Sequence, residues 1–331
     1  MTTIPRQEVV ATAYMLDRLQ KEATKKARNS VKKWIKANPN WEAADLRNYC
    51  IALVNKLVSE YGIASSSLAC DLYDGIMGGE FAPAEPWSGD LSDKVARSVR
   101  YQLKKALNGD IDAYLKAIDE MTAYYVKQYA NETTMANCER DSRLYSPSGM
   151  GEGLGQAHNA FALPSNGRPG AYRSNMRRNS RGETLSFGVP AFARVPTGLE
   201  TCTYCVMLAS RGFVYRSADS AGHADHRGCN CLIVPGRYGD VVEGVDTAAQ
   251  YDCWRELEAL EAWKAKNPDK MDTAELERRK QEIVNGYGDS LAISIEPGEV
   301  RKLASTLRNY DGYRLGGWYT PRARMADNYQ D

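Results

Sequence analysis

Six cysteine and histidine side chains lie within thirty residues of this chain, and five of them stand at spacings that suit a metal ion. Cys202 and Cys205 form a Cys-x-x-Cys turn, and His226, Cys229 and Cys231 follow as a second short cluster. A Cys-x-x-Cys turn directs two thiolates at one point, and an imidazole with further thiolates completes a tetrahedron around zinc. The spacing therefore predicts one zinc ion held by four of these five side chains.

The ligand types predict a structural zinc rather than a catalytic one. Catalytic zinc keeps one position open for water, whereas sites rich in thiolate are closed. His223 is an alternative ligand, and Asp225 lies beside His226, but the sequence has no His-Glu-x-x-His pair. It also has no phosphate-binding loop and no Gly-x-Ser-x-Gly nucleophile elbow, so we predict no enzymatic activity.

Two other interpretations of the cluster stay open. Free cysteine is often buried as a small hydrophobic side chain, and a pair of cysteines could instead form a disulfide. The remaining four cysteines are scattered over predicted helices, where we interpret them as core or surface side chains: Cys50, Cys70, Cys138 and Cys253.

The residues around the cluster resemble a family of phage proteins. They are similar to minor capsid proteins of the MuF-like head morphogenesis group, in the versions found in phages and prophages of actinobacteria. The resemblance rests on Ala193 to Gly198, Thr201 to Gly212, Phe213, Tyr215, His226-x-x-Cys229-x-Cys231 and Val234-Pro235. It is specific over about residues 190–236, and it departs from the family at Asn230, where a charged residue is frequent.

The resemblance implies a structural role in the assembly of a phage head (procapsid). It implies a position near the portal, contact with the portal protein or the major capsid protein, and a part in DNA packaging. The protein would then belong to the virion and be assembled in the host cytoplasm. The alternative from another class is a zinc-stapled protein that binds or processes nucleic acid.

An arginine-rich stretch precedes the cluster and contains one acid, Glu183. Guanidinium groups bind phosphate and carboxylate alike, so this stretch predicts contact with packaged DNA or with an acidic partner surface. The other interpretation is a solvated loop, because no aromatic ladder interleaves the arginines. The arginines are Arg168, Arg173, Arg177, Arg178, Arg181 and Arg194.

The amino-acid composition restricts the class of protein further. The 331 residues are 43% hydrophobic, which is enough for a packed core, and 43 basic residues balance 42 acidic ones. Binding of polyanions by the whole surface is therefore not implied. The N-terminus lacks the apolar core of a signal peptide, and no run of about eighteen apolar residues exists, so we expect a protein of the host cytosol without a membrane segment.

The patterning predicts an α+β fold that is predominantly α, in four parts. They are a helical domain (1–145), a Gly/Pro/Ser-rich and then Arg-rich connector (146–190), a zinc-stapled α/β module (191–245) and a helical C-terminal region with an aromatic tail (246–331). Helices are expected over 5–36, 41–61, 65–76, 90–107, 111–131, 246–265 and 272–283, with Asp90, Asp110 and Asp272 as N-caps. Strands are expected over 229–234, ended by Pro235, and over 291–295.

The first predicted helix carries a long apolar stripe from Val9 to Trp34. A long amphipathic helix needs a surface that buries its apolar face. Either a portal or capsid partner provides that surface, or residues 42–76 fold back and cover the stripe.

Overall fold

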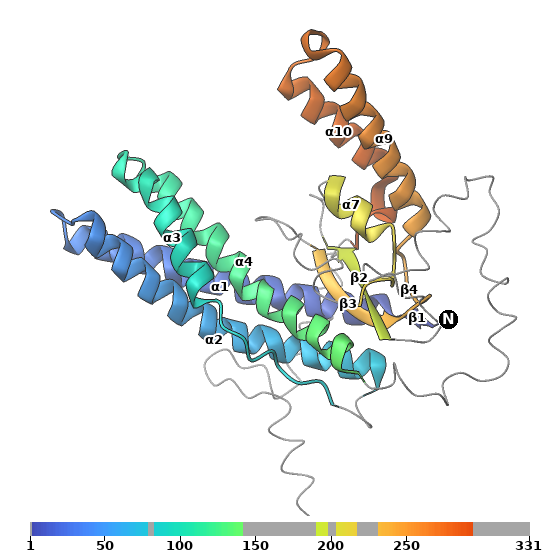
Figure 1. The fold of residues 1–331 in the computed structure, drawn as a ribbon, viewed down its shortest axis with the longest axis horizontal. Coiled ribbons are helices and arrows are strands. Elements are labelled where there is room, and N and C mark those ends of the chain that lie inside the picture. Colours follow the sequence, from blue (N-terminus) through green and yellow to red (C-terminus); the bar gives the residue numbers. More distant parts are fainter. Residues whose placement is uncertain (1, 79–82, 142–189, 198–202, 217–230, 294–331) are drawn as a thin grey trace, which may run out of the picture.

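The computed structural model describes residues 2–78, 83–141, 190–197, 203–216 and 231–293. Within these ranges the protein is predominantly helical with few strands, as the sequence predicts (Figure 1). The helices are α1 (Arg6–Ala37), α2 (Ala43–Met77), α3 (Ser92–Leu107), α4 (Ile111–Arg140), α7 (Thr203–Ala209), α9 (Thr247–Lys266) and α10 (Thr273–Tyr287), with 3₁₀ turns η4 (Pro268–Lys270) and η5 (Gly288–Ser290). The strands are β1 (Thr3–Ile4), β2 (Pro190–Pro196), β3 (Cys231–Arg237) and β4 (Val241–Val242).

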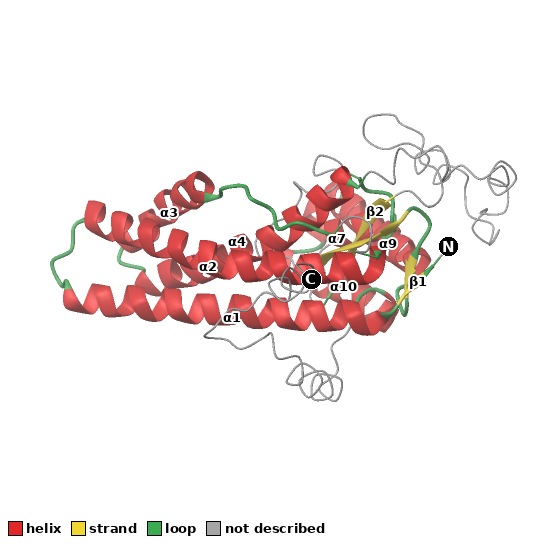
Figure 2. Ribbon diagram, turned by 90° about the horizontal axis from the view of Figure 1, so that it is seen from below, coloured by secondary structure: helices red, strands yellow, loops and turns green. Residues whose placement is uncertain are grey.

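Helices α1 to α4 form an elongated bundle in which α2 and α4 lie between α1 and α3 (Figure 2). The apolar stripe of α1 faces this central pair, and Val9, Ala23, Ala27 and Val31 are completely buried. The chain's own helices therefore cover the stripe, as the fold-back interpretation predicts. A portal or capsid partner cannot use this apolar face without opening the bundle.

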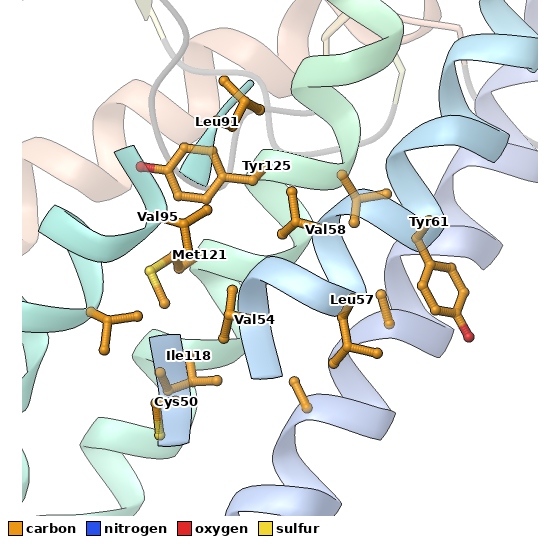
Figure 3. Close-up of a cluster of buried hydrophobic side chains, with 14 of the residues drawn as sticks. Cys50, Val54, Leu57, Val58, Tyr61, Leu91, Val95, Ile118, Met121 and Tyr125 are labelled. Carbon is orange, nitrogen blue, oxygen red and sulfur yellow. The ribbon is translucent and has the colours of Figure 1, made fainter. Parts of the chain in front are cut away.

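The centre of the bundle is an apolar core contributed by all four helices (Figure 3). Val54 from α2, Val95 from α3 and Ile118 from α4 are fully buried there. Helices α2 and α4 approach closely at Gly62, where an added Cβ would lie 2.6 Å from the ring of Tyr129. Glycine at this position is therefore a packing requirement of the α2–α4 contact.

Helix α2 is one continuous helix, whereas the sequence pattern predicts two helices separated after Tyr61. Small residues follow Tyr61, and they pack against α4 instead of ending the helix. The Thr133 hydroxyl of α4 donates to the Ser66 hydroxyl over 2.9 Å, so the buried polar group of α2 has a partner on the neighbouring helix. Buried serine is tolerated in a helix when such a bond satisfies it.

Strands β2 and β3 form an antiparallel ribbon at one end of the bundle (Figure 1). Pro235 does not end β3, which continues to Arg237. Phe192 faces Pro235, and its N–H and carbonyl both bond to Tyr215 on the other side, over 2.7 and 3.2 Å. Because the backbone groups of Phe192 bond to Tyr215, no hydrogen bond from position 235 to β2 is needed. Proline, which has no N–H, is therefore tolerated there.

The ribbon shares hydrophobic clusters with the bundle. One cluster joins Val10 of α1 and Leu72 of α2 to Val195 and Val234 of the ribbon. A neighbouring cluster joins Tyr73 of α2 and Cys138 of α4 to Phe192, Leu208 and Ile233. Folding of the ribbon and folding of this end of the bundle are therefore coupled through common side chains.

The N-terminus of the chain is tied to a segment far along the sequence. Strand β1 pairs in parallel with β4, with Thr3 beside Val241 and Ile4 beside Val242. The Thr2 N–H also donates to the Asp240 carboxylate over 2.7 Å. The start of α1 is thus held by residues that follow the ribbon.

Helices α9 and α10 form a hairpin that projects away from the bundle (Figure 1). Its base packs on α7 through Val206, Cys253, Leu257 and Leu291. The predicted strand over 291–295 is wrong for its described residues, 291–293, which are not in a strand. Leu291 is instead buried in this cluster, and Ile293 extends β2 only by one bond, from its N–H to the Pro196 carbonyl at 2.9 Å.

Two of the three predicted N-caps are confirmed. The Asp110 carboxylate accepts the Ala113 N–H over 2.9 Å, and that of Asp272 accepts the Glu275 N–H over 2.7 Å. Asp90 lies one residue too early, since α3 begins at Ser92, and its carboxylate bonds to Ser92 instead. None of the described helices is long and apolar enough to cross a membrane.

Candidate metal centre and other candidate sites

Two of the five predicted zinc ligands belong to the described residues. Cys205 lies in the first turn of α7, and Cys231 is the first residue of β3. Three predicted ligands and the alternative ligand lie outside the described residues: Cys202, His226, Cys229 and His223.

The topology brings Cys205 and Cys231 to the same end of the ribbon. Cys231 faces Pro196, the last residue of β2, in the antiparallel register. The chain then leaves β2 and begins α7 at Thr203, and α7 packs back on β2. Cys231 therefore lies where β2 ends and β3 begins, and Cys205 lies on a helix that packs against β2.

Both thiols are shielded from water, with 2% of Cys205 and 1% of Cys231 exposed. Burial without an open position fits a closed structural site better than a catalytic site that must admit water. Among the described residues, no group of three or more His, Cys, Asp or Glu side chains is arranged to hold a metal. The fit to zinc accordingly rests on the two thiols and on where the chain places them.

The four other cysteines are buried in helices, as core side chains. Desolvation raises the pKa of Cys50 to about 11 and that of Cys253 to about 12. Burial also raises the pKa of Cys138 far above its usual value. These thiols stay neutral at physiological pH, so they are poor nucleophiles and poor metal ligands.

The arginine-rich stretch lies largely outside the described residues, which exclude Arg168, Arg173, Arg177, Arg178 and Arg181. Arg194 is described, and its interpretation as a surface contact is wrong. It lies within β2 opposite Ile233, and only 1% of it is exposed. A strand position that points into the core explains this burial, which the charge pattern alone could not show.

A second candidate site, which the sequence analysis missed, is an open groove of about 530 Å³ at the turn between α1 and α2. The Trp34 and Tyr49 rings stack at its wall, with centroids 5.1 Å apart, and Trp41 and Asp45 also line it. The α1–α2 turn lies at the end of the bundle away from the ribbon (Figure 1). The groove contains no nucleophile with a neighbouring base, so it has no catalytic arrangement.

The chain belongs to the VG15 protein family, whose model matches residues 6–148 and 170–257, more than half of the chain. It is also similar to the Gene 15 protein of Mycobacterium phage D29, with 39% identity over 77 residues. That alignment covers 14% of this chain and 28% of the relative, so this chain spans less than a third of the relative's length. Together these matches mark the chain as a phage protein. No solved structure is significantly similar to it.

Proposed function

We propose that this protein is a minor capsid component that takes part in head assembly near the portal of its phage, and that a structural zinc ion holds part of its fold. The observation that carries the proposal is the resemblance over residues 190–236, because much of it falls on β2, α7 and β3. These elements form one unit that packs on the bundle. The match to a phage family supports the same assignment.

The proposed role is structural. The function needs surfaces that dock on a portal or capsid protein and a fold that keeps those surfaces in place. A zinc ion bound by Cys205, Cys231 and two of Cys202, His226 and Cys229 would supply cross-links between α7 and the ribbon. Structural zinc contributes directly to folding energy, about 10–16 kcal/mol of apparent binding energy in small zinc-binding peptides.

Mass spectrometry of purified particles tests the assembly role. We expect the protein in procapsids at a low copy number relative to the major capsid protein. A phage that lacks the gene should yield heads that are misassembled or empty of DNA. The proposal would be contradicted if the protein were found neither in procapsids nor in mature particles and if a phage without the gene formed normal heads.

Metal analysis tests the zinc. Protein purified without chelator should hold one zinc per chain, and both Cys205→Ser and Cys231→Ser should lose it. The matched control is Cys253→Ala, which removes a buried cysteine on α9 outside the cluster and should retain the metal. Wild-type protein without zinc would overturn the metal assignment and leave the assembly role to be judged by the particles.

The same variants report on the coupling between ribbon and bundle. Because the ribbon shares apolar clusters with α2 and α4, loss of zinc should expose amides of β2, β3 and the adjoining ends of these helices to exchange. Amides near Cys50, at the other end of α2, should keep their protection. Uniform loss of protection along α2 would instead mean that the bundle and the ribbon unfold as one unit.

A further inference from the structure

We infer that the outer face of α3 binds the phosphate backbone of double-stranded DNA without regard to its sequence. This face is separate from the predicted zinc ligands and from the arginine-rich stretch, and the inference does not depend on the proposed assembly role. It rests on the arrangement of charge on one described helix.

Helix α3 contains five basic residues and one acid, Asp93. Lys94, Arg97, Arg100 and Lys104 are all exposed, while Val95 and Val99 on the opposite side are fully buried. The spacing of i, i+3, i+6 and i+10 keeps the four cations on the solvent side of the helix. At a rise of 1.5 Å per residue they extend over roughly 15 Å.

These cations have no carboxylate partner among the described residues. The structure shows ion pairs for α1, α4, α9 and α10, but none for α3. The Arg97 guanidinium bonds only to a backbone carbonyl, that of Asp93 at 3.4 Å. The face therefore presents a net positive charge to solvent, which Asp93 offsets only in part.

The arrangement of basic residues on α3 lowers the stability of the helix. Arg97 and Arg100 are three residues apart, and Arg100 and Lys104 four apart, so like charges are neighbours on the helix surface. Lys94 also lies in the first turn, where the helix dipole favours an acid. A face that only needed to be soluble could carry Glu and Lys in alternation, so the excess of basic residues, with Asp93 as the one acid of α3, indicates an external anion.

An exposed tyrosine completes the face. Tyr101 is 63% exposed, and the Lys104 ammonium lies 4.2 Å from the centre of its ring. This contact holds the ammonium beside the tyrosine, whose hydroxyl can donate to a phosphate oxygen. Lysine, arginine and tyrosine are among the side chains that contact phosphates in protein–DNA interfaces.

Duplex DNA fits this face better than a protein surface or a lipid bilayer does. DNA presents one negative charge for about every 1.7 Å of its axis, so an extended row of cations meets phosphates along its whole length. The cores of protein–protein interfaces are depleted in charged residues, which dominate here. A membrane-binding helix must insert its apolar face, and that of α3 is buried in the bundle.

The near-neutral net charge of the chain does not oppose such binding. Charges separated by more than the Debye length, about 8 Å at physiological ionic strength, are largely screened. The acids of α10 lie on a hairpin that projects away from the bundle (Figure 1), so they do not cancel the local field of α3. Binding should be weak and strongly dependent on salt.

The test is the salt dependence of binding of the full chain to a fluorescent 30-base-pair duplex, with R97Q/R100Q/K104Q as the variant. Glutamine has nearly the helix propensity of arginine and lysine, so the helix should be retained, and circular dichroism checks this. Each lost phosphate contact lowers the slope of log affinity against log salt by about 0.9, so three contacts lower it by about 2.7. Between about 50 and 200 mM salt, the wild type should lose about 40-fold more affinity than the variant.

The matched control is R278Q/R279Q/K280Q on α10, which changes the net charge by the same amount but removes cations that are already paired. It should leave the slope unchanged, and duplexes of unrelated sequence should bind alike. The inference is overturned if the α3 variant keeps the wild-type slope, or if the α10 control loses as much. It is also overturned if the wild type binds only single strands, acidic proteins or anionic vesicles.

Discussion

Helices α3 and α10 are almost equal in length, 16 and 15 residues, and both are rich in charge, yet they arrange it in opposite ways. On α10 every basic side chain has an acidic partner. Arg278 and Arg279 both pair with Glu275, and Lys280 pairs with Glu277 and with Glu261 of α9. On α3 none of the basic side chains has an ion-pair partner among the described residues.

The comparison teaches that a count of charges does not identify a binding surface. The whole chain is nearly neutral, and α10 contributes to that balance locally, residue by residue. Helix α3 lacks this local balance of charge. Each like-charged pair four residues apart costs about 0.2–0.5 kcal/mol of helix stability. An unfavourable arrangement of this kind is informative because packing does not require it.

The two helices also differ in what holds them in place. The inner face of α3 is part of the main core, with Val95, Val99 and Leu103 buried there. No side chain of α10 is fully buried. The core can therefore support an unfavourable outer face on α3, whereas α10 depends more on pairing between its own side chains.

The largest effect should come from the inner faces. Leu103→Ala on α3 leaves a cavity in the core and should lower the free energy of unfolding by about 2–5 kcal/mol. Leu276→Ala is the matched change on α10, where the side chain is only half-buried, and it should cost about 1 kcal/mol or less. Urea denaturation measures both, and equal losses would contradict the conclusion that α3 is anchored in the core more firmly than α10.

A smaller effect should come from reversing one charge on α3. Arg100→Glu removes a like-charged neighbour of Lys104 and creates a Glu–Lys pair four residues apart in the favourable order, so it should stabilise the protein by about 0.5 kcal/mol. The same variant should bind duplex DNA more weakly. Arg100→Gln should lie between the two proteins in stability, and a destabilised Arg100→Glu would show that the exposed charges of α3 are already optimal for folding.

The smallest effect should come from the pairs of α10, because they are exposed. Hydrogen bonds from Arg279 and Arg278 hold the pKa of Glu275 below its usual value. A carboxylate with a lowered folded pKa contributes stability above its unfolded pKa, and that contribution is lost as pH falls through the folded value. Glu275→Gln should therefore lower amide protection in α10 at pH 6, and the difference from the wild type should shrink as the pH falls below the unfolded pKa.

Glu277→Gln serves as the control for that experiment, since Glu277 pairs only with Lys280. It should reduce protection less than Glu275→Gln does. The contrary result, equal protection in all three proteins at pH 6, would mean that the α10 pairs contribute nothing measurable and that its charges are merely solvated.

The helices were largely predictable because their signals are local. Asp110 and Asp272 cap the helices that they precede, and α1 follows its apolar stripe within one residue of the expected ends. The continuity of α2 was not predictable from its small polar residues, since the hydroxyl that bonds to Ser66 comes from another helix. The burial of Arg194 depends in the same way on what packs against β2.

The candidate sites were also predictable only where their signal is local in the sequence. The spacing of Cys202, Cys205, His226, Cys229 and Cys231 is visible in the sequence, and the ribbon topology adds where Cys205 and Cys231 lie. The α3 face could have been found from the sequence, because the spacing from Lys94 to Lys104 is regular. However, its cations are recognised as a binding face because they have no carboxylate partner among the described residues. That observation requires the positions of the neighbouring helices. The β1–β4 pairing carries almost no sequence signal, since each strand has only two residues.

That pairing sets an order of events during synthesis. Thr2 leaves the ribosome long before its partner Asp240, which is 238 residues further along the chain. At about 5–20 residues per second, the N-terminal strand waits roughly 12–50 s for β4 to be made. Helices α1 to α4 emerge well before then, so the bundle can form while its first residues are still unpaired. A change that prevents the β1–β4 pairing would therefore disturb a late step of folding rather than an early one.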